Sequence, residues 1–138
     1  MVWSAAVHEA DWVVLGPGSW FSSVLPHLLV PELAAALRTT SARRCVTLNL
    51  APQVGETDGY SAEEHLEVLA AHAPGLRIDA VIADPSAVED EPGLAKLAES
   101  LGASLCVRVV REAPGVARHD PAALALAYRE VFGRVSDR

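Results

Sequence analysis

Four short apolar runs, separated by longer segments, constrain the fold of this chain most strongly. They read WVVL at 12–15, CVTLNL at 45–50, IDAVIA at 78–83 and LCVRVV at 105–110. Each run is nearly continuous rather than alternating with polar residues, which is typical of parallel strands covered by helices on both faces. The sequence therefore predicts an α/β fold, a doubly wound, Rossmann-like three-layer sandwich with about four parallel strands.

Helices are predicted between these runs and after the last one. Ser61 precedes Glu64 by three residues, a capping box that marks a helix start. The Val30-Pro31 step divides the segment after the first run into a short and a longer helical piece. Asp120 and Pro121 suit the N-cap and first position of a last helix. Apolar residues at helical spacing predict that this last helix packs on the sheet: Leu124, Ala127, Tyr128, Val131 and Phe132.

Composition limits the class of protein. The 138 residues, 51% of them apolar, suffice for one domain with its own core. The net charge is −7 and no Lys/Arg block occurs, so nucleic-acid binding is not expected. An 18-residue apolar span and a signal-peptide pattern are both absent from the sequence, which argues against membrane insertion and secretion. Cys45 and Cys106 sit within apolar runs, as buried thiols do, and a cytoplasmic location is predicted.

The first candidate site is the turn that follows the first apolar run, Gly16-Pro17-Gly18-Ser19. In open parallel sheets ligands bind beyond the carboxyl ends of the strands, where the strand order reverses. A glycine turn there lets backbone amides approach a phosphate, and Ser19, Ser22 and Ser23 can add hydroxyl donors. A tight turn with a serine N-cap explains this short motif equally well.

The second candidate site is the loop after the second run, which contains Asn49, Gly55, Glu56, Thr57 and Asp58. The phrases ADWVVLGPGSWFSSVLPHLLVP and NLAPQVGETDGYSAEEH resemble the gluconeogenesis factor family, which is related to the phospholactate transferase of deazaflavin cofactor synthesis. The resemblance covers most of residues 5–111. It places on family motif positions Gly16, Pro17, Gly18, Ser19, Ser23, Asn49, Gly55, Glu56, Thr57 and Asp58.

The resemblance implies a regulatory protein that binds a nucleotide sugar of the UDP-N-acetylglucosamine kind and affects cell-wall precursor supply and cell shape. An enzyme of cell-wall precursor synthesis as partner, and a homo-oligomer, are compatible with that role. The alternative is a transferase that uses a guanine nucleotide and a divalent metal. The transferases carry Gly-Pro-Ser-Asn-Pro in the first loop, so Gly-Pro-Gly-Ser favours the regulator. A third interpretation is a structural half without independent activity.

Family members begin with a Rossmann-type strand and a glycine-rich loop, which this chain does not have. Residues 1–138 are therefore interpreted as the C-terminal portion of a single nucleotide-binding domain whose N-terminal, glycine-rich half is absent.

Other polar residues have simpler interpretations. The histidines show no zinc-ligand spacing, although Glu56 and Asp58 are candidates to hold a metal carried with phosphates. His65 is interpreted as a helix-face or capping residue. Asp84, before Pro85, is expected to cap the next segment, and VEDEP at 88–92 is expected to be a solvated acidic turn. No nucleophile, base and acid set emerges from the sequence, so no catalytic residue is predicted.

Overall fold

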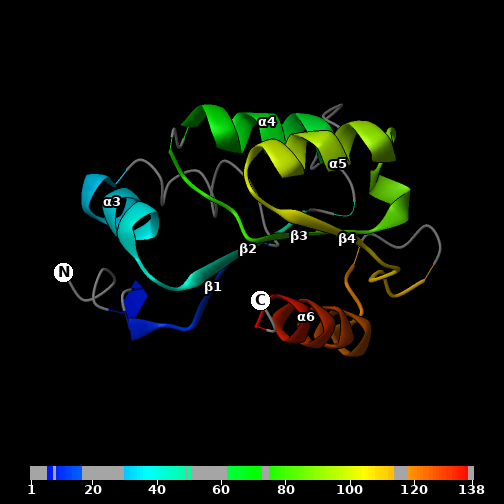
Figure 1. Ribbon diagram of the computed structural model, residues 1–138. Helices are drawn as coiled ribbons and strands as arrows, with labels where there is room; N and C mark the ends of the chain where they lie inside the picture. Colours follow the sequence, from blue (N-terminus) through cyan, green and yellow to red (C-terminus); the bar gives the residue numbers. More distant parts are fainter. Residues whose placement is uncertain are drawn as a thin grey trace.

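Four strands and their connecting helices account for most of the chain that the structure describes. The computed structural model describes residues 6–7, 9–16, 30–48, 50, 62–72, 75–113 and 118–136 (Figure 1). In chain order the elements are β1 Trp12–Leu15, α3 Pro31–Thr39, β2 Arg43–Thr47, α4 Ala62–His72, β3 Ala80–Ala83, the short 3-10 helix η2 Pro85–Ala87, α5 Glu91–Ser100, β4 Ser104–Val107 and α6 Pro121–Ser136.

The strands form one parallel sheet in the order β1-β2-β3-β4. Trp12 pairs with Arg43, Cys45 with Ala80, and Ala80 with Ser104. The predicted α/β fold with about four parallel strands is therefore confirmed. The order is sequential, so these four strands contain no reversal, and β1 lies at one edge of the sheet.

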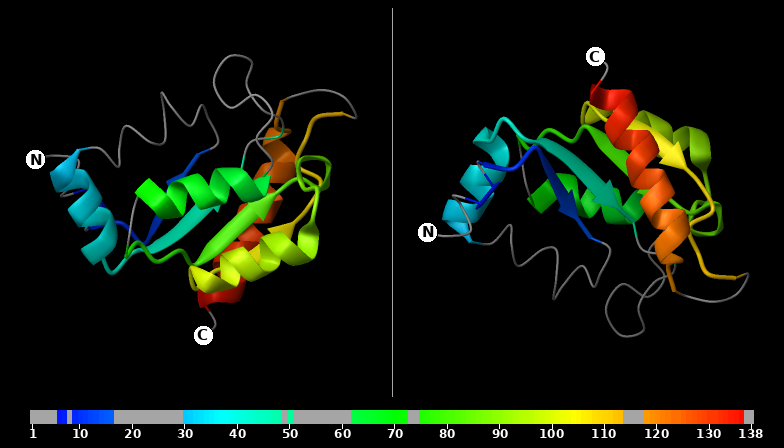
Figure 2. Two further views of the ribbon diagram at one scale, coloured as in Figure 1. Left: turned by 90° about the horizontal axis from the view of Figure 1, so that it is seen from above. Right: turned by 90° about the horizontal axis from the view of Figure 1, so that it is seen from below.

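Helices cover both faces of the sheet, as the apolar runs predict. Leu37 of α3, Leu66 of α4 and Leu94 of α5 share one apolar cluster with Val46 and Val81 of the sheet. On the opposite face, α6 contributes a second cluster that contains Cys45, Ile82, Cys106, Ala127 and Val131. The views from above and below show α4 and α5 on one side of the strands and α6 on the other (Figure 2). The result is a three-layer sandwich.

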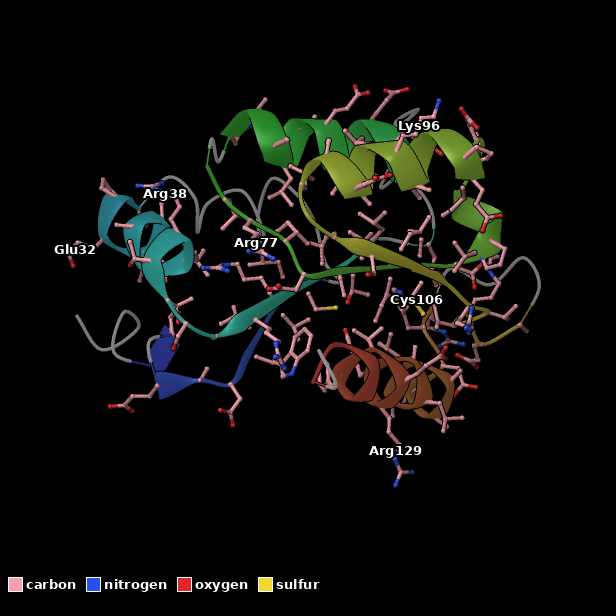
Figure 3. All side chains as sticks on the ribbon, viewed as in Figure 1. Glu32, Arg38, Arg77, Lys96, Cys106 and Arg129 are labelled. Atoms are coloured by element: carbon pink, nitrogen blue, oxygen red, sulfur yellow. The ribbon has the colours of Figure 1, made fainter. Side chains whose placement is uncertain are left out.

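The two cysteines lie in the layer between the sheet and α6, and Figure 3 shows Cys106 there. Both are free and buried, as predicted. Burial, together with the nearby Cys106, raises the pKa of the Cys45 thiol to about 12. Cys45 therefore stays protonated and packs as a small apolar side chain.

Three strands differ in their bounds from the apolar runs, and β2 differs most. The run predicts 45–50, whereas the strand begins at Arg43 and ends at Thr47. Arg44 belongs to the strand although it is charged and buried, because its guanidinium donates hydrogen bonds to backbone carbonyls of the segment that ends α3. Nη2 lies 3.1 Å from the Arg38 oxygen and 2.9 Å from the Thr40 oxygen, and Nε donates to Leu37. These bonds offset the cost of burying the charge.

β3 and β4 are also displaced from the predicted ranges 78–83 and 105–110. β3 begins only at Ala80, because the amide of Ile78 binds the Leu101 carbonyl instead of a neighbouring strand. β4 begins at Ser104 and ends at Val107. After it, the amides of Val110 and Arg111 bind the carboxylate of Asp84, and Val109 is 68% exposed. The Asp84 side chain therefore accepts from the backbone amides that would otherwise pair with β3 if β4 were longer.

The helix predictions are confirmed where the structure describes the residues. α3 begins at Pro31 and α6 at Pro121, and the Asp120 side chain accepts a hydrogen bond from the Ala122 amide at 3.0 Å. Trp12 stacks on Phe132 of α6 with ring centroids 4.4 Å apart. α4 begins at Ala62, but its predicted cap at Ser61, like the short helical piece before Pro31, lies outside the described residues.

The acidic segment VEDEP is not simply a solvated turn. Asp90 caps α5, because its side chain accepts a hydrogen bond from the Gly93 amide at 3.1 Å, and the helix begins at Glu91. The amide of Asp90 in turn binds the Glu63 carboxylate of α4, which links the two helices. An exposed Asp suits both an N-cap and a solvated turn, so the two have the same sequence pattern here.

Arg44→Lys tests the role of the buried guanidinium. We expect the free energy of unfolding to fall by about 1–3 kcal/mol, because an ammonium cannot reproduce the fork that binds several carbonyls. Urea denaturation at pH 7 measures the change. Arg38→Lys, at an exposed position of α3, is the control and should change stability by less than about 0.5 kcal/mol. Equal effects at the two positions would contradict this role of Arg44.

Candidate functional site

The carboxyl ends of the four parallel strands lie at one edge of the sheet. Gly16 follows β1 directly, and Asp84 follows β3. Gly16 has φ +81°, in the left-handed region that favours glycine. The other predicted ligand residues lie outside the described residues: Pro17, Gly18, Ser19, Ser22, Ser23, Asn49, Gly55, Glu56, Thr57 and Asp58. Their role in ligand binding stays a prediction.

Asp84 is the most highly connected polar residue described at this edge. Its side chain is 2% exposed, and it accepts hydrogen bonds from the Ser86 amide at 2.9 Å and the Ser86 hydroxyl at 2.5 Å. It also accepts bonds from the amides of Val110 at 2.9 Å and Arg111 at 3.2 Å. Asp84 caps η2, as the sequence predicts. The additional bonds show that it also fixes the chain after β4.

The electrostatics of Asp84 follow from these contacts. Burial alone would raise the pKa of its carboxyl group, but the hydrogen bonds from Ser86, Val110 and Arg111 outweigh burial and hold the pKa below its ordinary value. Arg111 adds an ion pair, with Nε 3.5 Å from Oδ1. Asp84 is thus a buried carboxylate that is charged at neutral pH and satisfied by the protein itself.

The segment from Val110 to Asp120 returns across this edge to α6. Arg111 and His119 form an antiparallel bridge, and the Asp120 amide donates to the Val110 carbonyl at 2.7 Å. The Glu112 amide donates to the Arg118 carbonyl at 2.8 Å. The two stems of this return segment are therefore tied to each other, and Asp84 ties the first stem to β3.

Two histidines of the described chain have a pKa below the ordinary value. Burial lowers the pKa of His119, while nearby Asp84 and a hydrogen bond with the Leu48 backbone partly oppose that shift. This contact links the return segment to the end of β2. His65 of α4 is 3% exposed, and burial lowers its pKa, opposed in part by Glu64. His65 is therefore a core-facing helix residue, in line with its helix-face interpretation.

The described residues contain no group of three or more His, Cys, Asp or Glu side chains that could hold a metal ion. The acidic candidates Glu56 and Asp58 lie outside them. A hollow of about 490 Å³ is lined by Ala10, Asp11, Trp12, Ser41 and Arg43. It lies at the amino ends of β1 and β2, opposite the edge where ligands of parallel sheets bind. We therefore place the candidate site at the carboxyl edge.

Asp84 is expected at a strand end from the sequence, but no sequence pattern pairs it with Arg111 or His119. The separation along the chain is the reason, because Arg111 follows its hydrogen-bond partner Asp84 by 27 positions. The sequence does contain one signal for these contacts, which is an acidic residue directly after a fully apolar strand. A carboxylate at such a position is buried and therefore needs hydrogen-bond partners.

The fold and edge define a class: a parallel α/β protein with a left-handed glycine at the carboxyl end of a strand. The chain belongs to the family described as 2-phospho-L-lactate transferase CofD, whose sequence model matches residues 3–112. It is 50% identical over 132 residues to a Mycobacterium tuberculosis protein provisionally named a gluconeogenesis factor, and 39% identical over 85 residues to the gluconeogenesis factor of Halalkalibacterium halodurans. The resemblance noted in the sequence is confirmed.

These relatives are longer than this chain. The matched region is 94% of this chain but 38% of the M. tuberculosis protein, and 62% of this chain but 26% of the H. halodurans protein. A crystal structure of a UPF0052 family member from Bacillus halodurans superposes with a TM-score of 0.75 and 29% identity, covering 91% of this chain and 44% of that one.

No helix among the described residues has the length and apolar character needed to cross a bilayer.

Asp84→Asn tests the buried carboxylate. At pH 7 we expect the free energy of unfolding to fall by about 2–3 kcal/mol, because the amide cannot accept from all the present donors. The pKa of Asp84 in the folded chain is below the ordinary 3.8, so its stabilisation is present above 3.8 and is lost as pH falls through the lowered pKa. Urea titrations from pH 7 to pH 2.5 should therefore show the difference between wild type and variant shrinking below 3.8.

The control for this measurement is Glu89→Gln, which removes an exposed negative charge five residues further along the chain. Its effect should stay within about 0.5 kcal/mol. If Asp84→Asn is equally mild at pH 7, Asp84 does not fix the return segment in the way described.

Proposed function

We propose that this chain contributes to a nucleotide-sugar-binding regulatory protein of the gluconeogenesis factor type, which acts in the cytoplasm on cell-wall precursor supply and thereby on cell shape. The observation that carries the proposal is Gly16 in the left-handed conformation directly after a parallel strand. It opens the Gly-Pro-Gly-Ser motif in a chain that is 50% identical, over 132 residues, to a protein provisionally named a gluconeogenesis factor. A UDP-N-acetylglucosamine-like ligand would place its phosphates on the amides of this turn.

The loop from Asn49 to Asp58 would complete the polar contacts. Strand-end amides and hydroxyls, such as those of Asn49 and Thr57, suit a sugar or base edge. We further propose that a second wall of the cleft lies beside the outer edge of β1. The four described strands run in sequential order, and ligand clefts of such folds form where the order reverses. This agrees with the interpretation of residues 1–138 as the C-terminal portion of a larger nucleotide-binding domain.

The second candidate function is transfer of a phospholactate-type group with a guanine nucleotide and a divalent metal. The family description supports it, because it names a 2-phospho-L-lactate transferase. Glu56 and Asp58 would then be the candidates to hold the metal. The first loop favours the regulator, because it reads Gly-Pro-Gly-Ser instead of Gly-Pro-Ser-Asn-Pro.

A thermal-shift panel separates the two functions. UDP-N-acetylglucosamine, UDP, GDP with and without Mg²⁺, and NAD are titrated against this chain and, in parallel, the full-length M. tuberculosis relative. A ligand at 100 times its Kd stabilises the folded state by about 2.7 kcal/mol, which raises Tm by several degrees. We expect a saturable response to UDP-N-acetylglucosamine, larger in the longer protein. A thermal shift seen only with GDP and Mg²⁺ would contradict the regulatory function and favour the transferase function.

Gly18→Val tests the first loop. We expect loss of UDP-N-acetylglucosamine binding in calorimetry with an unchanged circular dichroism spectrum, because a branched side chain blocks the approach of the backbone to a phosphate. The matched control is Gly133→Val on α6, where an added Cβ meets nothing within 4 Å. Binding of near-native strength by the Gly18 variant would show that this turn is only structural.

A further inference from the structure

We propose that Arg111 is an anion-binding residue at the carboxyl edge of the sheet, oriented by Asp84 to receive a phosphate group of the ligand. This inference rests on the proposed nucleotide-binding function, and it adds a residue that lies outside both sequence motifs.

The position of Arg111 is fixed from two directions. Its amide and its Nε both face the Asp84 carboxylate, at 3.2 Å from Oδ2 and 3.5 Å from Oδ1. The same carboxylate is held by Ser86 and by the Val110 amide, so it cannot turn away without breaking several hydrogen bonds. The His119 backbone pairs with that of Arg111 from the other stem of the return segment. The guanidinium is therefore oriented before any ligand arrives, which lowers the entropy cost of binding.

The donors of Arg111 exceed the acceptors that the described protein offers. A guanidinium carries five N–H donors, and a side chain that is only 15% exposed normally has most of its donors satisfied. Within the described residues, the one side-chain partner of Arg111 is Asp84, which faces Nε and makes an ion pair without a hydrogen bond. No hydrogen bond or ion pair with a described residue uses the two terminal nitrogens, and such a pair of nitrogens can bind phosphate oxygens in a bidentate manner.

Neighbouring arginines differ from Arg111 in how they are held. Arg108 pairs with Glu130 of α6, and Arg118 pairs with Glu112. All four of these side chains are at least 37% exposed, and exposed pairs hold their partners weakly. Arg111 is instead held by a carboxylate that is 2% exposed. Of these three arginines, it is the one with a fixed orientation.

The distance across the edge suits a ligand with several polar groups. Adjacent strands lie about 4.8 Å apart, so the ends of β1 and β3 are separated by roughly 10 Å. Gly16 stands at the first of these ends and the Asp84–Arg111 pair at the other. A diphosphate that carries a sugar and a base can contact both places, with one phosphate on Arg111.

Calorimetric titration of this chain with UDP-N-acetylglucosamine and, separately, with inorganic pyrophosphate tests the inference. Arg111→Gln should weaken binding of both ligands by about 10- to 100-fold, the range for losing a charge-assisted hydrogen bond. Arg108→Gln removes the same charge from an exposed position and should change either affinity by less than about threefold. Arg111→Lys keeps the charge and loses the fork, so it should bind between wild type and Arg111→Gln. Thermal unfolding of each variant checks folding, and Arg111→Lys carries the test if Arg111→Gln does not fold.

The outcomes separate this inference from the proposed function. If the wild type binds UDP-N-acetylglucosamine and the Arg111 variants bind it equally well, the inference is overturned and the proposed function stands. If the wild type binds pyrophosphate in an Arg111-dependent way but not the nucleotide sugar, the anion site stands and the proposed ligand is wrong. If the wild type binds neither ligand, both are overturned.

Discussion

The buried carboxylate of Asp84 is the constraint on which the carboxyl edge depends. A charged group that is 2% exposed must be satisfied by the protein, because burial removes its hydration. Its four hydrogen bonds come from Ser86, Val110 and Arg111. Meeting that requirement ends the pairing of β4 with β3 and starts the segment that returns to α6. The order of elements follows from the apolar runs, but the course of the chain over the strand ends follows from this one side chain.

The amino end of the sheet obeys the same physical rule with the opposite charge. Arg44 is buried within β2, and its guanidinium donates to three carbonyls of the segment that ends α3. Burial lowers its pKa, and nearby Asp79 partly compensates. Helix ends leave carbonyls without intrahelical partners, so a buried cation there satisfies both the helix and itself. Each end of the sheet thus holds a buried ion whose partners come from the adjoining connection.

These two ions also explain how far the sequence predicts the structure. β1 matches its predicted run residue for residue, and α6 begins where Asp120 and Pro121 indicate, because both depend on local signals. The bounds of β2 and β4 do not match. A prediction from apolar runs assumes that charged residues are exposed. Arg44 and Asp84 are nevertheless buried, because residues of a neighbouring element or residues far along the chain form hydrogen bonds with them. The left-handed conformation of Gly16 agrees with the choice of glycine at that position, since this preference is local. The Asp84–Arg111 pair is not predictable in this way, since its partners meet only in the folded sheet.

The internal satisfaction of Asp84 also determines the charge that the edge presents. The chain has a net charge of −7, which by itself disfavours an anionic ligand. At this edge, however, the backbone amides and the Nε of Arg111 that surround the buried carboxylate balance its negative charge within the protein. An acidic protein can in this way hold a carboxylate at the edge where ligands of parallel sheets bind, without leaving its charge unpaired there.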